Sequence, residues 1–186
     1  ADQTLRFGEG MCAESSGWRK TEADKHGWRQ VVAAGTWEEL VLYGGGQRIN
    51  DNCHRLPFTS TLLDQSKAAA CATELALAKG GEILVSILRP GTHLRAHCGP
   101  SNNRLTVHLG LRIPSGCSIR VGDETRGWEE GRCMVFDDSF EHEVWHRGDE
   151  ARVVLLLNIW HPNITAAQKE SSMEDMFAKG MAYKWH

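Results

Sequence analysis

Seven short β-rich runs, separated by turn-forming residues, fill the chain from residue 82 to residue 162 and constrain its fold more than any other feature. The runs read EILVSILRP, THLRAHCG, RLTVHLGLRIP, CSIRVGDE, RCMVFDD, EHEVWHRG and RVVLLLNIWHP. Pro-Gly, Pro-Ser-Gly, Gly-Asp-Glu and Arg-Gly-Asp stand between them, and such residues favour tight turns. Many short strands at close spacing are typical of an antiparallel sandwich or barrel. We therefore predict a mainly β fold whose core is a β-sandwich flanked by helices.

The segments on either side of these runs have a more helical composition. The segment 18–48 contains helix formers, a helix-start signal at Thr36-Trp37-Glu38-Glu39 and a stop at Gly44-Gly45-Gly46, so we expect helix and loop there. The segment 59–81 carries leucines and alanines and ends at two glycines, which predicts a helix. The segment 165–186 is expected to form a covering helix.

Length and composition indicate one globular domain. With 186 residues, of which 41% are hydrophobic, the chain can bury a single core. We expect residues 1–80 to pack on the core as helix and loop, residues 81–162 to form the β core, and residues 163–186 to form a C-terminal helix. The whole chain is then a single domain.

Charge and hydropathy narrow the class of partner. The chain has 21 basic and 24 acidic residues, a net charge of −3, and no run of like charge that would bind nucleic acid. Its longest apolar run, residues 153–157, is far shorter than the roughly 20 residues of a membrane span. We expect a soluble, cytoplasmic protein with no nucleic-acid partner, and leave its oligomeric state open.

The cysteines give no metal or disulfide framework. Six cysteines are scattered along the chain without a Cys-x-x-Cys pair. Unpaired cysteines are most often buried, so we interpret these residues as free, buried thiols. One bridge, between Cys53 and Cys71, remains possible at this stage.

The histidines divide into three groups by their sequence context. Three lie in polar loops or at the terminus and are interpreted as surface residues: His26, His54 and His186. Three flank turns, where a capping or solvent role is expected: His93, His146 and His161. Three remain as candidates for a site: His97, His108 and His142.

Two of these candidates lie at strand ends. His97 ends a predicted strand before a turn rich in Gly, Pro and Asn, and His142 begins another after DDSFE. Such histidines can converge at one mouth of a β-sandwich and hold a ferrous ion. Arg152, on the following run, can supply a bidentate cation for a carboxylate. This pattern matches ferrous, 2-oxoglutarate-dependent oxygenases, except that Gly99 stands where a ligating acid usually follows the first histidine.

The longer strings around these residues resemble a known family. PGTHLRAHCGPSNNRLTVHLGLRIP, WEEGRCMVFDDSFEHEVWH and NIWHP closely resemble the aspartyl/asparaginyl β-hydroxylases, whose two-histidine iron site has glycine in place of the acid. The resemblance covers about residues 80–165, with a weaker match in WEELVLYGGGQR. It implies a double-stranded β-helix core of the jelly-roll or cupin type. It also implies a hydroxylase that uses Fe(II), 2-oxoglutarate and O2, releases succinate and CO2, and acts on an unactivated C–H bond of an amino acid, a peptide or protein, or a small molecule.

The same resemblance assigns roles to single residues. It makes His97 and His142 the iron ligands, and makes Arg152 and Ser86 the partners of the distal carboxylate of 2-oxoglutarate. It also makes His108 a co-substrate-binding residue near the proximal carboxylate. Asp138 becomes a catalytic acid that does not ligate the metal but steadies metal-bound water or a ligand imidazole.

Two departures from the family pattern concern the neighbouring pocket. Thr106 stands where the best-known members have an arginine that contributes to the co-substrate pocket, and Arg104 is the nearest remaining cation. Both are therefore candidate co-substrate-binding residues. Glu82 and Leu84 stand where the peptide-hydroxylating members have glutamine and lysine, so a cation that would pair with an acidic substrate is lost.

Three other readings of the same residues stay open. The chain could be a β-sandwich module that binds a metal or a small acid without turnover, because the arginine expected at Thr106 is missing. A halide could occupy the open iron position, as in halogenating relatives. A zinc hydrolase of the cupin type would need His108 as a third ligand.

Overall fold

The computed structural model describes residues 17–22 and 31–178, and its core is two antiparallel β-sheets that face one another. The larger sheet has the order β1-β3-β5-β12-β7-β10, and its strands are β1 (Trp18–Glu22), β3 (Thr36–Gly44), β5 (Ile83–Leu88), β12 (Arg152–Trp160), β7 (Arg104–Arg112) and β10 (Cys133–Phe136). A short strand, β4 (Gln47–Arg48), pairs with β3. The smaller sheet has the order β2-β6-β11-β8-β9, and its strands are β2 (Val32–Ala34), β6 (His93–His97), β11 (His142–His146), β8 (Cys117–Val121) and β9 (Glu124–Arg126).

The strand order identifies the fold. From β5 to β12 the chain passes back and forth between the sheets, so that β5-β12-β7-β10 faces β6-β11-β8-β9. Strand β5 pairs with β12, and β6 pairs with β11. The segment is thus one long antiparallel hairpin that is folded over into two sheets. This is the jelly-roll, or double-stranded β-helix, arrangement. The predicted fold class is confirmed, and β1, β2 and β3 extend the two sheets.

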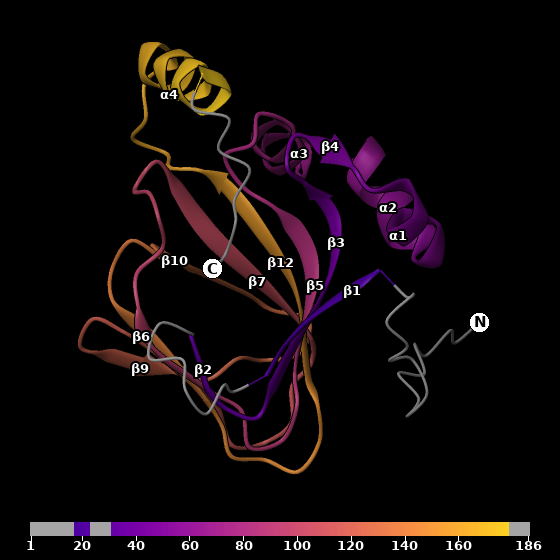
Figure 1. Cartoon of the computed structure of the whole chain (residues 1–186), viewed down its shortest axis with the longest axis vertical. Helices are drawn as coiled ribbons and strands as arrows, with labels where there is room; N and C mark the ends of the chain where they lie inside the picture. The colour runs from indigo at the N-terminus through magenta and orange to yellow at the C-terminus, as the bar shows by residue number, and fades with distance from the viewer. Residues whose placement is uncertain (1–16, 23–30, 179–186) are drawn as a thin grey trace.

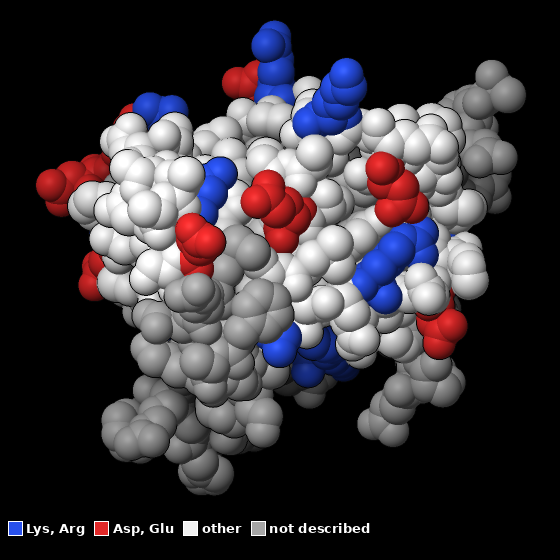
Figure 2. Space-filling model, turned by 90° about the horizontal axis from the view of Figure 1, so that it is seen from above, with Lys and Arg blue, Asp and Glu red and all other residues white. Residues whose placement is uncertain are grey.

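Helices cover the outer face of the larger sheet, so this sheet lies between the helices and the smaller sheet (Figure 1). The helices are α1 (Asn50–Arg55), α2 (Pro57–Gln65) and α3 (Ala70–Leu77), and a fourth, α4 (Ala166–Ala178), follows the last strand. None of the helices among the described residues is long and apolar enough to cross a membrane. On the face seen in Figure 2, acidic and basic side chains lie among one another rather than in a patch of one sign.

Strand β5 is buried on both faces, which explains its nearly continuous apolar sequence. Side chains alternate between the two faces of a strand. Ile83, Val85 and Ile87 pack in the apolar cluster under the helices, whereas Leu88 packs in the cluster between the sheets. Ser86 is the polar exception on the inner face, where it is only 2% exposed.

The segment 36–44 was expected to be helical, and this expectation is wrong: it forms the nine-residue strand β3. Leu40 and Leu42 face the helices, while Trp37 and Glu39 line the space between the sheets. This alternation has the period of a strand, and pairing with β1 and β5 on both sides outweighs the local helix-start signal.

The other helix predictions are confirmed in part. The predicted helix over 59–81 is two helices, α2 and α3, which are separated at Ser66, where the backbone is extended. Helix α1 lies between the two N-terminal segments for which helix was predicted. The described part of 165–186 is helical, and Thr165 and Gln168 form a reciprocal capping box at its start, with hydrogen bonds of 2.8 Å and 3.2 Å. Residues 179–186 lie outside the described part.

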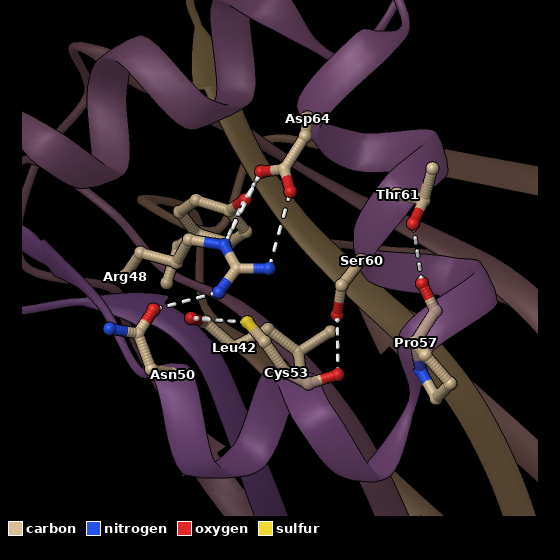
Figure 3. A network of polar contacts seen from close by, with 9 residues as sticks. Leu42, Arg48, Asn50, Cys53, Pro57, Ser60, Thr61 and Asp64 are labelled. Atoms are coloured by element: carbon tan, nitrogen blue, oxygen red, sulfur yellow. Dashed lines mark hydrogen bonds and ion pairs between the residues drawn. The ribbon is translucent and has the colours of Figure 1, made fainter.

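A polar network joins the helices to β3 and β4 (Figure 3). Arg48 donates to Asp64 of α2 at 3.2 Å and to Asn50 of α1 at 2.7 Å, and the Tyr43 hydroxyl also donates to Asp64. The Cys53 thiol donates to the Leu42 carbonyl at 3.5 Å. These bonds fix the helices over the outer face of the larger sheet.

The five described cysteines are free, as predicted, so the possible Cys53–Cys71 bridge is not formed. The expectation that they are buried is right for Cys53 and wrong for Cys98 and Cys133, which are exposed. The sixth, Cys12, lies outside the described residues. Among the histidines set aside, His54 is exposed, His93 pairs with Glu143 at 2.7 Å, and the His161 ring accepts a hydrogen bond from a nearby backbone N–H. His146 does bond within its turn as expected, but at 2% exposure it is buried rather than solvated. His26 and His186 lie outside the described residues.

Candidate functional site

All eight residues predicted to form the site line one cavity between the inner faces of the two sheets. They are Ser86, His97, Arg104, Thr106, His108, Asp138, His142 and Arg152. His97 and His142 belong to the smaller sheet, and most of the others project from β5, β7 and β12 of the larger one. The cavity therefore brings together residues that are far apart in the sequence.

His97 and His142 form a pair held by the backbone. They lie directly opposite one another in the β6–β11 register, and their ring centroids are 4.1 Å apart. Nδ1 of His97 bonds to the Arg95 carbonyl at 2.6 Å, and Nδ1 of His142 bonds to the Phe140 carbonyl at 3.0 Å. Because a carbonyl only accepts, each Nδ1 carries the proton and each Nε2 keeps its lone pair. That is the tautomer a metal ligand needs.

The surroundings of His97 favour its neutral form. Burial lowers the pKa of His97, and the neighbouring His142 lowers it further. A neutral imidazole can ligate a metal, whereas an imidazolium cannot.

Gly99 and Asp138 define what lies beside the two histidines. A Cβ on Gly99 would lie 2.5 Å from Cγ of Asp138 and 2.6 Å and 2.7 Å from its oxygens. The Gly99 N–H also donates to the Asp138 carbonyl. The carboxylate of Asp138 thus fills the space that a side chain at 99 would need. Within the residues described, no group of three His, Cys, Asp or Glu side chains is arranged to hold a metal.

Asp138 is itself held by Arg104. Arg104 Nη2 donates to Oδ2 of Asp138 at 3.0 Å, and Nη1 donates to the Gly80 carbonyl at 3.1 Å. Both side chains are buried. The other carboxylate oxygen, Oδ1, is buried without a hydrogen-bond partner. This oxygen can accept a hydrogen bond from a ligand or a water.

Arg152 is a buried cation that lacks an anionic partner. It is 2% exposed, and its Nε and Nη1 atoms have no hydrogen-bond partner. Its guanidinium carbon lies 5.0 Å from the centre of the Trp128 ring, and burial lowers the pKa of Arg152 to about 10. An unpaired buried charge is costly, so this geometry suits a bound carboxylate, which can accept two parallel N–H bonds.

Two tryptophans orient Ser86 and His108. The Trp37 indole donates to Oγ of Ser86 at 3.0 Å, which leaves the serine hydroxyl proton free to donate. The Trp128 indole donates to Nδ1 of His108 at 3.1 Å, so the imidazole proton lies on Nε2. Burial, with smaller contributions from Arg152 and His142, holds the pKa of His108 well below its ordinary value. His108 is thus a neutral donor.

Thr106 belongs to a row of neutral polar groups. Its hydroxyl accepts from the Asn158 side-chain amide at 2.9 Å, and the amide oxygen accepts from the Glu82 N–H at 3.0 Å. Thr106 and Asn158 are register partners in β7 and β12. The missing arginine is therefore replaced by an uncharged, hydrogen-bonded pair.

Four side chains that support the predicted residues were not themselves predicted from the sequence: Trp37, Glu39 and Asn158 line the cavity, and Trp128 donates to His108. Trp37 and Glu39 were missed because β3 was taken for a helix. The alternation of TWEELVLYG is the signal that places both on the inner face, and Glu39 is the register partner of Ser86. Trp128 lies at the start of a string quoted for the family resemblance, but its contacts depend on the folded chain.

Comparisons with known proteins give the family of the chain. The family model for aspartyl/asparaginyl beta-hydroxylase matches residues 8–162. Human aspartyl/asparaginyl beta-hydroxylase is 43% identical over 139 residues, which cover 74% of this chain and 17% of the human protein. Human aspartate beta-hydroxylase domain-containing protein 2 is 35% identical over 181 residues, covering 96% of this chain and 45% of the relative.

The chain spans less than half the length of these relatives. Among solved structures, a predicted oxalate decarboxylase from Thermotoga maritima aligns with 77% of this chain over 92% of its own length. The sequence identity is 10% and the TM-score is 0.46, so this similarity carries no argument about the chemistry. The family assignment rests instead on the sequence match across the strands that carry the cavity. The chain belongs to the aspartyl/asparaginyl beta-hydroxylase family.

Proposed function

We propose that this chain is an Fe(II)- and 2-oxoglutarate-dependent dioxygenase that hydroxylates an unactivated C–H bond and releases succinate and CO2. The observation that carries the proposal is the buried, unpartnered guanidinium of Arg152 in the same cavity as two histidines whose Nε2 atoms are free to ligate. A structural core would leave neither group unsatisfied. Membership of a hydroxylase family supports the same reading.

The donor set fits both groups. His97 and His142 would hold the ferrous ion through Nε2, because their Nδ1 atoms are already committed to carbonyls. Arg152 and the Ser86 hydroxyl would hold the distal carboxylate of 2-oxoglutarate. His108, a neutral donor through Nε2, would bind near the proximal carboxylate. Thr106 and Arg104 would shape the wall of the pocket.

When bound, ferrous iron and 2-oxoglutarate supply the means to activate O2, and the chain positions the reactants and excludes water. Trp37 and Trp128 hold Ser86 and His108 in their donor orientations. Arg104 holds the Asp138 side chain in place, so its free Oδ1 can accept a hydrogen bond from a water beside the histidines. Asp138 is in this proposal a carboxylate that orders water and is not itself a ligand.

Anaerobic titration tests the proposal. Fe(II) and 2-oxoglutarate added together should produce the weak visible charge-transfer band of the chelate, and Zn(II) should not. The Arg152→Met variant should lose the band at low 2-oxoglutarate, while Arg112→Met, which alters an exposed ion pair outside the cavity, should keep it. Absence of the band at saturating concentrations would instead favour a binding module without turnover or a zinc enzyme. Succinate release on admission of O2 completes the test.

The substrate class in this proposal is an amino acid, a peptide or protein, or a small molecule. The names of the relatives refer to aspartyl and asparaginyl groups as the substrates of those proteins. In this chain Glu82 faces the cavity, so the charge of the accepted substrate is a separate question.

A further inference from the structure

Two carboxylates that the proposed iron and co-substrate chemistry does not use line the same cavity. Glu39 lies on β3, opposite Ser86 in the register, and Glu82 directly precedes β5. Arg19 of β1 donates to both oxygens of Glu82, at 3.2 Å and 3.0 Å, and lies 3.4 Å from Oε2 of Glu39. Arg19 is the register partner of Glu39 and is partly exposed.

The charges in this cluster of Arg19, Glu39 and Glu82 do not balance. One guanidinium serves two carboxylates, and its geometry commits it to Glu82. Glu39 is 7% exposed and retains only the longer contact. Burial raises the pKa of Glu39 to about 7, with Arg19 lowering it and Glu82 raising it. The negative charge of Glu39 is thus poorly compensated in the free protein.

Two arginines, Arg104 and Arg152, line the cavity itself. Arg104 is bonded to Asp138 and Gly80. Arg152 is the register partner of Leu88 on the β12 side of β5, whereas Glu39 is the register partner of Ser86 on the β3 side. The cavity therefore receives an unpartnered cation from one neighbour of β5 and an excess carboxylate from the other.

We infer that the substrate carries a cationic nitrogen, an ammonium or a guanidinium, that binds beside Glu39 and Glu82. The inference rests on the proposed function, since it names the substrate class of that same cavity. The buried Oδ1 of Asp138, which has no hydrogen-bond partner among the described residues, lines the same cavity and indicates that the cavity takes a polar ligand. An acidic side chain would meet two carboxylates there and be repelled, whereas a lysine-like or arginine-like group would complete the charge.

Matched probes test this inference. N-acetyl lysine amide and N-acetyl arginine amide carry only the side-chain charge, and the norleucine and citrulline amides are their neutral counterparts. N-acetyl aspartate amide serves as the anionic probe. In calorimetry at pH 8, each basic probe should bind at least about tenfold more tightly than its neutral counterpart, the effect of one charged hydrogen bond. Equal or absent binding of the basic probes, or a preference for aspartate, would overturn the inference.

Variants with opposite expected effects make the test independent of folding. Glu39→Gln should abolish the preference for the basic probes, and Arg19→Met, which releases both carboxylates, should increase it. Glu124→Gln, which removes an equal charge from an exposed ion pair on β9, should leave it unchanged. A preference that survives Glu39→Gln and Arg19→Met unchanged contradicts the assignment.

Failure of this inference is distinguishable from failure of the proposed function. The charge-transfer band of Fe(II) and 2-oxoglutarate is recorded without any probe, so its presence supports the co-substrate site whatever the probes do. The calorimetry is carried out on the chain alone and repeated with Mn(II) and 2-oxoglutarate. A normal band with no charge preference removes only the cationic substrate.

Discussion

The two inner faces of the barrel present different chemistry to the same cavity. The smaller sheet offers two histidines, His97 and His142, among apolar side chains such as Leu94, Ile119 and Val144. The larger sheet offers nearly all the charged and hydroxyl groups, from Glu39 on β3 to Arg104 on β7. We infer that metal binding is separated from carboxylate and substrate recognition, so that single substitutions should affect one and spare the other.

The largest effect is expected on the smaller sheet. Replacing His97 or His142 with alanine leaves one protein ligand, too few to hold Fe(II) against water. Iron binding, measured by titration, should be lost in either variant. His93→Ala is the matched control, because His93 lies on the same strand as His97 but pairs with Glu143 and does not line the cavity. Near-native affinity in His97→Ala or His142→Ala would overturn the ligand assignment.

The second effect belongs to the larger sheet. Arg152→Met should leave iron affinity largely intact and weaken 2-oxoglutarate binding by about 2 to 5 kcal/mol, the range for removing one partner of a buried charge pair. Binding of 2-oxoglutarate in the presence of Mn(II) measures this. Unchanged affinity would assign the distal carboxylate to another cation, and Arg104 could serve only by leaving Asp138.

The sequence predicts the strands after residue 82 better than the strands before residue 49. The seven runs from residue 82 onward all form strands, because their alternation and turn residues act locally. Strand β3 was mistaken because TWEELVLYG carries a helix-start signal, and only its pairing with β1 and β5 fixes the extended backbone. Glu39 was missed with it, and with Glu39 the excess negative charge of the cavity.

The site shows the same division between local and long-range information. His97, His142 and Arg152 stand out from strand-end position and family resemblance, and they line the same cavity. The contact of Gly99 with Asp138, and the bond from Arg104 to Asp138, join β6, β7 and β10 through the fold. No sequence pattern in one chain specifies such contacts, because they depend on how the strands are stacked.

A third substitution acts where the two faces meet. Gly99→Asp places an acid at the position of the usual third ligand. The new Cβ would collide with the carboxylate of Asp138, and the new carboxylate would bring a second negative charge beside it. We expect coupled turnover, scored as product per succinate, to fall or stay flat, and stability to drop by about 1 to 3 kcal/mol as for other overpacked positions. Iron occupancy is measured in parallel.

Gly99→Ala separates the two causes, because alanine makes the same collision without the charge. A loss of stability in both variants supports the steric explanation, and a loss only in the aspartate variant supports the electrostatic one. A large gain in coupled turnover for Gly99→Asp would identify the chain as a degraded oxygenase and favour the binding-module reading.

The smallest effect concerns Glu39 and depends on pH. Because its pKa is raised from 4.5 to about 7 by burial, the protonated form is favoured in the folded chain. Its contribution to stability is therefore fully present below pH 4.5 and is lost as the pH rises through 7. Glu39→Gln removes this loss, so the variant should gain about 1 to 2 kcal/mol relative to the wild type between pH 5 and pH 8, a value reduced for solvent screening. Urea unfolding at both pH values, without metal, measures the difference.

The control is Glu124→Gln, which should show no such dependence because the Glu124 side chain is 66% exposed. A Glu39→Gln difference that stays constant with pH would mean that Arg19 compensates Glu39 fully. In that case the larger sheet would carry no excess charge, and the contrast between the two neighbours of β5 would disappear.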